Sequence, residues 1–167
     1  MRTTSNHGVF LQDPGVTFTN NTIIGASGAY GLIIQAIGTQ IGTLSSITIH
    51  SCASVPFIIN TSTYGIISTM AVWRCGGACQ ISGDVTINDL TAFGNLTSNI
   101  LALGGRLVLN NPVLNGDSTF ATVNGINSNT GDIGTEIFVN SGNLGTASGI
   151  KTAHTNDITI GVSPSYV

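Results

Sequence analysis

Short apolar triplets recur along the chain, and most of them end in a polar pair that often contains Asn. Each triplet has an apolar, a variable and a second apolar residue, so a strand would point both apolar side chains to the same side. Six segments align on this pattern: Val16–Asn20, Ile47–Ser51, Val85–Asp89, Leu107–Asn111, Ile137–Ser141 and Ile158–Val162. The pattern predicts short strands that end at corners.

The aligned segments repeat at intervals that are typical of a solenoid. Their central residues are 31, 38, 22, 30 and 21 residues apart, and such periods indicate stacked coils, the longer ones with an inserted loop. Second strands are expected between them, at Leu32–Ile34, Phe57–Ile59, Ile100–Leu103, Phe120–Val123 and Ile150–Thr152. No window combines helical periodicity with helix caps. The sequence therefore predicts an all-β chain with essentially no α-helix, a single domain over residues 1–167 folded as a right-handed parallel β-helix of about five to seven coils.

Asparagine occupies the fourth position of several aligned segments, where a corner is expected. Its side chain tolerates left-handed backbone angles, and its amide can pair with the Asn one coil above. We therefore expect Asn88, Asn110 and Asn140 to stack in successive coils.

Composition narrows the classes of partner. Only 7% of residues are charged, against about a quarter in ordinary domains, so Thr, Ser, Asn and backbone must cover the surface. A net charge of −3 with four basic residues speaks against a nucleic-acid partner, which needs clustered Lys and Arg. No apolar run approaches the length of a membrane span, so no membrane insertion is expected. Residues Met1–Asn6 lack the apolar core of a secretory signal, and no signal peptide is seen.

The chain has three cysteines, Cys52, Cys75 and Cys79. An odd number does not suit a disulfide framework. Cys75 and Cys79 could bind metal together with His50 or His7, but zinc knuckles usually place two residues between thiols and add a second pair. Buried free thiols are the favoured interpretation. We expect no metal and no cofactor.

One column of charged residues is a catalytic candidate. Asp84, Arg106 and Glu136 each precede a triplet and would point outward from neighbouring coils. The two carboxylates would lie about 9 to 10 Å apart, near the upper range for an inverting glycosidase, with Arg106 between them. The alternative, which the pattern favours, is a surface ladder of ion pairs worth about 0 to 1 kcal/mol each.

A second candidate site is Trp73 with Arg74, and Tyr64 close by in sequence. Aromatic faces stack on sugar rings, and Arg hydrogen-bonds to sugar hydroxyls, so these three residues are predicted to bind glycan. Trp73 could equally belong to the core, because residues Gly65 to Trp73 form an apolar run.

Two segments, Val16–Gly25 and Leu107–Gly116, resemble coils of pectate-lyase-like proteins, and the low-charge, Asn/Thr/Gly-rich composition resembles bacteriophage tailspikes. The resemblance extends over residues 9–162. It implies a homotrimer on the phage tail, joined to other tailspike chains, that binds bacterial surface polysaccharide and often cleaves it.

Tailspike catalytic β-helices have more coils than 167 residues provide, so we expect a fragment or C-terminal part of a larger assembly. The resemblance favours a structural and receptor-binding segment that recognises bacterial surface polysaccharide. The alternative is a polysaccharide depolymerase, a glycoside hydrolase or lyase acting on capsule or O-antigen.

Overall fold

A computed structural model describes residues 7–12, 15–28, 30–35, 43–60, 65–95, 97–115, 122–127, 136–144, 148–151 and 158–160. Their regular structure is entirely β, and no described segment forms a helix able to cross a membrane. The strands are β1 (His7–Leu11), β2 (Phe18–Ile24), β3 (Tyr30–Ile34), β4 (Leu44–His50), β5 (Val55–Asn60), β6 (Gly65–Trp73), β7 (Cys79–Ser82), β8 (Val85–Phe93), β9 (Thr97–Gly104), β10 (Arg106–Asn110), β11 (Val113–Asn115), β12 (Thr122–Asn127), β13 (Glu136–Asn140), β14 (Ser148–Lys151) and β15 (Ile158–Ile160).

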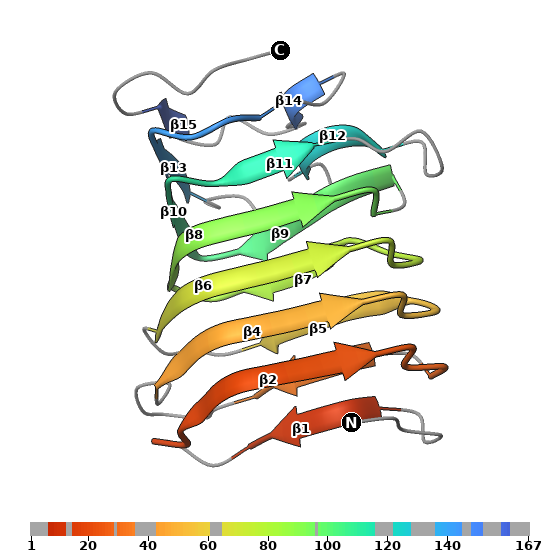
Figure 1. Cartoon of the computed structure of the whole chain (residues 1–167). Helices are drawn as coiled ribbons and strands as arrows, with labels where there is room; N and C mark the ends of the chain where they lie inside the picture. Colours follow the sequence, from red (N-terminus) through yellow and green to blue (C-terminus); the bar gives the residue numbers. More distant parts are fainter. Residues whose placement is uncertain are drawn as a thin grey trace.

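Two parallel sheets form the walls of the molecule. One has the order β1-β3-β5-β7-β9-β12-β14, and the other has the order β15-β13-β10-β8-β6-β4-β2, with β11 also paired to β8. In Figure 1 the front strands run left to right and the rear strands right to left as the chain climbs, which makes the winding right-handed. The predicted all-β, right-handed parallel β-helix is confirmed. About four turns are described, slightly fewer than the five to seven coils expected.

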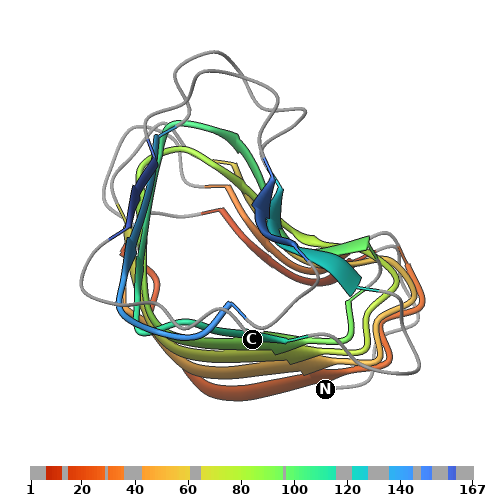
Figure 2. The ribbon, with the colours of Figure 1, turned by 90° about the horizontal axis from the view of Figure 1, so that it is seen from above.

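A column of left-handed residues bends the second sheet along its length. At each described residue of this column the backbone φ angle lies between 52° and 57°: Asn20, Ser46, Thr69, Asp89, Asn111 and Ser141. Asn and Asp tolerate this conformation because their short polar side chains bond locally, and Asn111 Nδ2 donates to Asp89 Oδ1 at 3.0 Å. Each bend separates two faces of the solenoid, and Figure 2 shows the superposed coils turning there.

A second left-handed corner ends the long strands. Gly25, Ser51, Arg74 and Gly94 have φ angles between 52° and 61°. Each of them donates its backbone N–H to a carbonyl of the next coil, at 3.1 to 3.2 Å. Both corners are therefore tied into the hydrogen bonding between coils.

Aliphatic side chains fill the interior in columns. In β8 the residues Val85 and Ile87 point inward before the bend, and Leu90 and Ala92 point inward after it. Their partners in β6 and β10 are equally buried, as are Leu32, Phe57 and Ile59 of the opposite sheet. Burial of this continuous core is the main favourable term of folding.

The register corrects one of the six aligned segments. Ile47 pairs with Met70, which in turn pairs with Leu90, so Ile47–Ser51 lies after the bend and not beside Val85–Asp89. The residues that share the column of Ile87 are Phe18, Leu44, Ile67, Leu109, Val139 and Ile160. Successive coils are thus 20 to 30 residues long. The error arose because the left-handed bend creates two similar apolar triplets within one strand.

The second strands were mostly predicted at the right places. Leu32–Ile34, Phe57–Ile59 and Ile100–Leu103 lie in β3, β5 and β9. The strand expected at Phe120–Val123 is instead β12, which begins at Thr122, and β7 was not predicted. The expected strand Ile150–Thr152 overlaps β14, and Thr152 lies outside the described residues.

The predicted stack of Asn88, Asn110 and Asn140 is confirmed. Asn110 Nδ2 donates to Asn88 Oδ1 at 2.7 Å, and Asn140 Nδ2 donates to Asn110 Oδ1 at 2.8 Å. The three residues face one another in the paired strands β8, β10 and β13. Asn110, in the middle of this ladder, therefore takes part in two side-chain hydrogen bonds, whereas Asn140 takes part in one.

Asn110→Ala should destabilise the fold more than Asn140→Ala. Two side-chain hydrogen bonds are lost in the first variant and one in the second, and each contributes about 0.5 to 1.5 kcal/mol net. Urea unfolding, followed by the loss of β-sheet circular dichroism, measures the difference. Equal midpoints for the two variants would show that the ladder contributes little.

Gly105→Ala should destabilise the fold by about 3 kcal/mol, the sum of left-handed strain and a backbone clash. Its φ angle is 77°, and an added Cβ would lie 2.5 Å from the carbonyl carbon of Gly83. Gly15 is the matched control, because its φ is 76° and no described atom lies within 4 Å of the added Cβ. Gly15→Ala should cost only about 1 to 2 kcal/mol. Similar unfolding midpoints for both variants would contradict this steric account.

Candidate functional site

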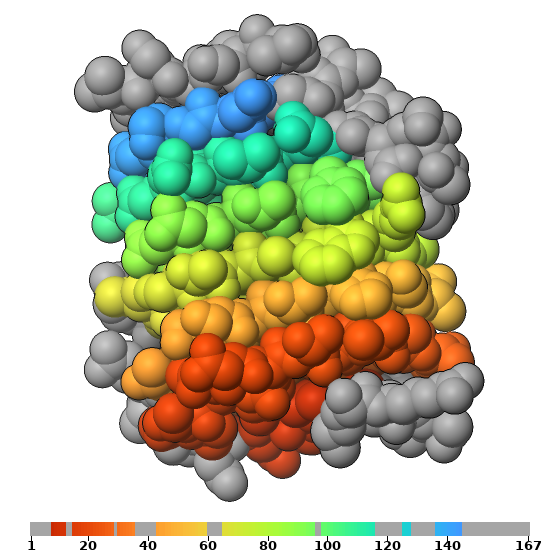
Figure 3. Space-filling view, in the orientation of Figure 1, coloured from red at the N-terminus to blue at the C-terminus, as the bar shows by residue number. Residues whose placement is uncertain are grey.

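The outward side of the sheet after the bend forms a flat face, which we call the aromatic face. It comprises the outward residues of the segments 21–24, 47–50, 70–73, 90–93 and 113–115. Figure 3 shows this face, with rows of side chains crossing β2, β4, β6, β8 and β11. Alternation places every second side chain of these segments on the surface.

Three aromatic rings stack on this face, one from each of three successive coils. His50 pairs with Trp73, and Trp73 pairs with Phe93. The His50 and Trp73 ring centroids are 4.8 Å apart with planes inclined by 6°, and those of Trp73 and Phe93 are 5.7 Å apart, inclined by 4°. Parallel rings at these distances are typical of offset stacking, which leaves part of each ring face uncovered. We call this row the aromatic ladder.

Polar and small side chains border the aromatic ladder. A neighbouring row on the same face consists of Thr22, Thr48, Ala71, Thr91 and Val113. None of the outward residues of the aromatic face is a carboxylate. The exposed Arg74 follows Trp73 directly at the second corner. Hydroxyl groups, rings and one guanidinium thus lie within a few coils of each other.

The structure places two of the three residues predicted to bind glycan at this face. Trp73 points outward and is partly exposed, so its alternative assignment to the core is wrong. Arg74 lies beside it, and Tyr64 lies outside the described residues. The partners in the aromatic ladder, His50 and Phe93, were missed. A search with a coil length of 20 to 23 residues, the spacing of these three rings, could have found them.

In the alignment of the six segments, His50 takes the fourth position, where Asn88, Asn110 and Asn140 stand. It is instead the last residue of β4, one position before the corner, and its Nδ1 lies 3.2 Å from the Ser51 hydroxyl. The misplaced Ile47 segment explains this error, because the wrong register aligned His50 with Asn88.

The charged column lies on a different face, before the bend. Arg106 and Glu136 are paired residues of β10 and β13, and Arg106 Nε lies 3.8 Å from Glu136 Oε2. The Arg106 guanidinium also lies over the Phe138 ring, 4.5 Å from its centroid. Asp84 Oδ1 accepts the backbone N–H of Arg106 at 2.9 Å. The fold therefore brings the three residues together as predicted, with Arg106 between Asp84 and Glu136.

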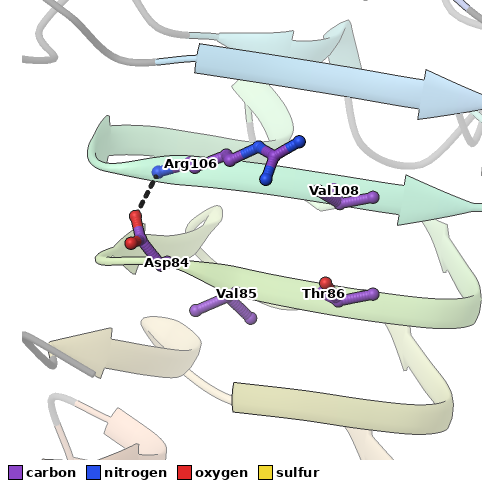
Figure 4. Close-up of a pocket in the computed structure, with 5 residues that line it drawn as sticks. All are labelled: Asp84, Val85, Thr86, Arg106 and Val108. Atoms are coloured by element: carbon purple, nitrogen blue, oxygen red, sulfur yellow. Dashed lines mark hydrogen bonds between the residues drawn. The ribbon is translucent and has the colours of Figure 1, made fainter. Parts of the chain in front are cut away.

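A small open pocket of about 130 Å³ lies beside this column, lined by Asp84, Val85, Thr86, Arg106 and Val108. Figure 4 shows the Arg106 side chain extending along β10, while Asp84 bonds to the backbone of Arg106. Both side chains of the ion pair are well exposed, 57% for Arg106 and 44% for Glu136. Ligand pockets usually enclose about 300 Å³ or more. The geometry thus fits a surface ion pair more readily than an enclosed active site.

The three cysteines are buried and carry free thiols. Cys52 and Cys75 lie in the turns that follow β4 and β6, and Cys79 begins β7. Within the described part of the chain, no three His, Cys, Asp or Glu side chains gather as a metal site would require.

Two arrangements therefore carry the chemistry of the described surface, the aromatic ladder with Arg74 and the charged column around Arg106. The first presents ring faces and hydroxyls on a flat surface. The second presents two carboxylates in separate coils. No protein family, curated protein or solved structure matches this chain, so its function has to be inferred from these two arrangements.

Proposed function

We propose that this chain is a carbohydrate-binding solenoid, a structural and receptor-binding segment of tailspike type that recognises bacterial surface polysaccharide through its aromatic face. The observation that carries the proposal is the aromatic ladder, three stacked rings that remain partly exposed on a flat surface. Contiguous apolar groups exposed on a protein surface often mark a binding site.

The chemistry of the face suits sugars. Sugar rings present C–H groups that pack on aromatic faces and hydroxyls that need hydrogen-bond partners. Offset stacking leaves ring surface available at His50, Trp73 and Phe93. The hydroxyls of Thr48 and Thr91 and the guanidinium of Arg74 supply donors, and the hydroxyls also accept. Since no carboxylate points out of this face, it does not repel an acidic glycan.

The repeating architecture supports a polymeric ligand. Equivalent outward positions recur about every 4.8 Å along the solenoid axis, so a chain of repeating sugars meets similar groups from coil to coil. Weak contacts that repeat in this way add to useful avidity. A globular site for a small molecule would instead need an enclosed pocket.

The resemblance to tailspikes also suggests an oligomeric state and a location for the chain. We propose a homotrimer on the phage tail, associated with other tailspike chains. Outside the aromatic face, large apolar side chains are exposed at Phe10 (48%) and Ile66 (39%), and neighbouring chains in a trimer would cover such groups.

Trp73→Ala should abolish retention of the protein on its polysaccharide, because it removes the central ring of the aromatic ladder. A panel of immobilised capsular and O-antigen polysaccharides serves as the probe, with bound protein measured at each. Phe138→Ala is the matched control, since it removes a partly exposed ring from the other face. Retention that survives Trp73→Ala but not Phe138→Ala would move the binding site to the charged column.

A second candidate function is depolymerase activity at the charged column. The observation that favours it is the placement of Asp84 and Glu136 in alternate coils on either side of Arg106. At about 9 to 10 Å, such carboxylates could serve as acid and base with a water between them.

The double variant Asp84→Asn, Glu136→Gln tests this second function. If the column is catalytic, the release of reducing ends from the same polysaccharide panel should fall by at least about a hundredfold, because general acid and base are both lost. The Asn and Gln side chains keep the shapes of the acids, so retention on the glycan should not change. Cleavage at the original rate would eliminate the column as an active site.

A further inference from the structure

Two buried thiols lie in adjacent coils, just past the corner that follows the aromatic ladder. Cys52 comes two residues after His50, and Cys75 comes two residues after Trp73, so both hold the same position in their coils. The pairing continues past the strands, because the N–H of Gly76 donates to the Cys52 carbonyl at 2.9 Å. The thiols are therefore neighbours along the solenoid axis.

Hydrogen bonds hold both thiols in the same orientation. Cys52 Sγ donates to the carbonyl of His50 at 3.8 Å, and Cys75 Sγ donates to the carbonyl of Trp73 at 3.4 Å. The backbone N–H of Cys52 also donates to Cys75 Sγ at 3.4 Å. The Cys75 sulfur is thus in direct contact with the backbone of Cys52.

The two thiols differ in reactivity. The neighbouring Cys75 side chain lowers the pKa of Cys52 to about 7, whereas the interaction with Cys52, together with burial, raises the pKa of Cys75. Cys52 is 4% exposed and Cys75 is fully buried. Cys52 is therefore the better nucleophile of the two, since thiolates react and thiols do not.

We propose that Cys52 and Cys75 form a disulfide within the folded solenoid, which links two successive coils just past the corner that follows the aromatic ladder. Residues at the same position of neighbouring parallel coils have Cα atoms about 4.8 Å apart, within the range of about 4.4 to 6.8 Å that disulfides span. This inference is independent of glycan binding.

Hydrogen peroxide is an oxidant small enough for this site. The Cys52 thiolate attacks one peroxide oxygen, the O–O bond breaks, and hydroxide leaves, which gives a sulfenic acid. Cys75 then attacks that sulfur, the S–S bond forms, and the sulfenic oxygen leaves as water with the Cys75 proton. In total two thiols and one peroxide give one disulfide and two waters.

Cys79 provides an internal control. It lies in the opposite sheet, paired with Ile100 of β9, and it is fully buried. Burial is also the main reason that its pKa is raised. The third thiol should therefore stay reduced when the other two combine.

The test treats folded protein with hydrogen peroxide and then blocks the remaining thiols with iodoacetamide. Non-reducing peptide mapping should find Cys52 joined to Cys75 and Cys79 alkylated. Cys79→Ser should give the same linked peptide, and Cys75→Ser should give none. Circular dichroism before treatment shows that each variant is folded.

Three results would overturn the proposal: no linked peptide from folded wild-type protein, a link that involves Cys79, or a Cys52–Cys75 link that forms only in urea. A second readout is the fluorescence of the single tryptophan. Since oxidation removes the thiol bond to the Trp73 carbonyl, the emission should shift in wild type and in Cys79→Ser but stay constant in Cys75→Ser. An identical shift in Cys75→Ser would assign it to another oxidation and count against the disulfide.

Discussion

The in-register pairing of parallel coils is the constraint on which this structure depends. Every backbone hydrogen bond between coils places a residue about 4.8 Å from its counterpart above and below. A side chain is therefore compatible with this stacking only if it packs well against similar side chains in the coils above and below. Amides bond to amides at Asn88 and Asn110, rings stack on rings at Trp73, and aliphatic residues form the interior.

The same constraint accounts for the low charge of the chain. Like charges in one column would repel at this spacing, and each buried or half-buried charge also loses hydration. The charged column avoids repulsion by alternating in sign, with Arg106 between Asp84 and Glu136. Thr, Ser and Asn carry hydrogen-bonding capacity without that penalty, which explains their abundance.

Repetition also favours binding over catalysis in this molecule. Catalysis needs different groups that converge on one reacting centre, whereas a column of equivalent positions offers a row of related groups to a repeating ligand. The aromatic ladder and its threonine row are of the second kind. The bend at the first column of left-handed residues separates this face from the charged column, so the two candidate sites can be altered independently.

The sequence by itself determined most of the strands, the solenoid and several neighbour relationships. Alternation within a strand and recurrence between coils are properties of residue order, so the stacked asparagines and the charged column around Arg106 could be predicted. Only the tertiary structure decided the register where coil length varies. The left-handed residue Thr69 inverts the alternation inside β6, and local patterns cannot tell the apolar triplets on its two sides apart. Hydrogen bonds to the neighbouring coils resolve that ambiguity, and they bring His50, Trp73 and Phe93 into one row.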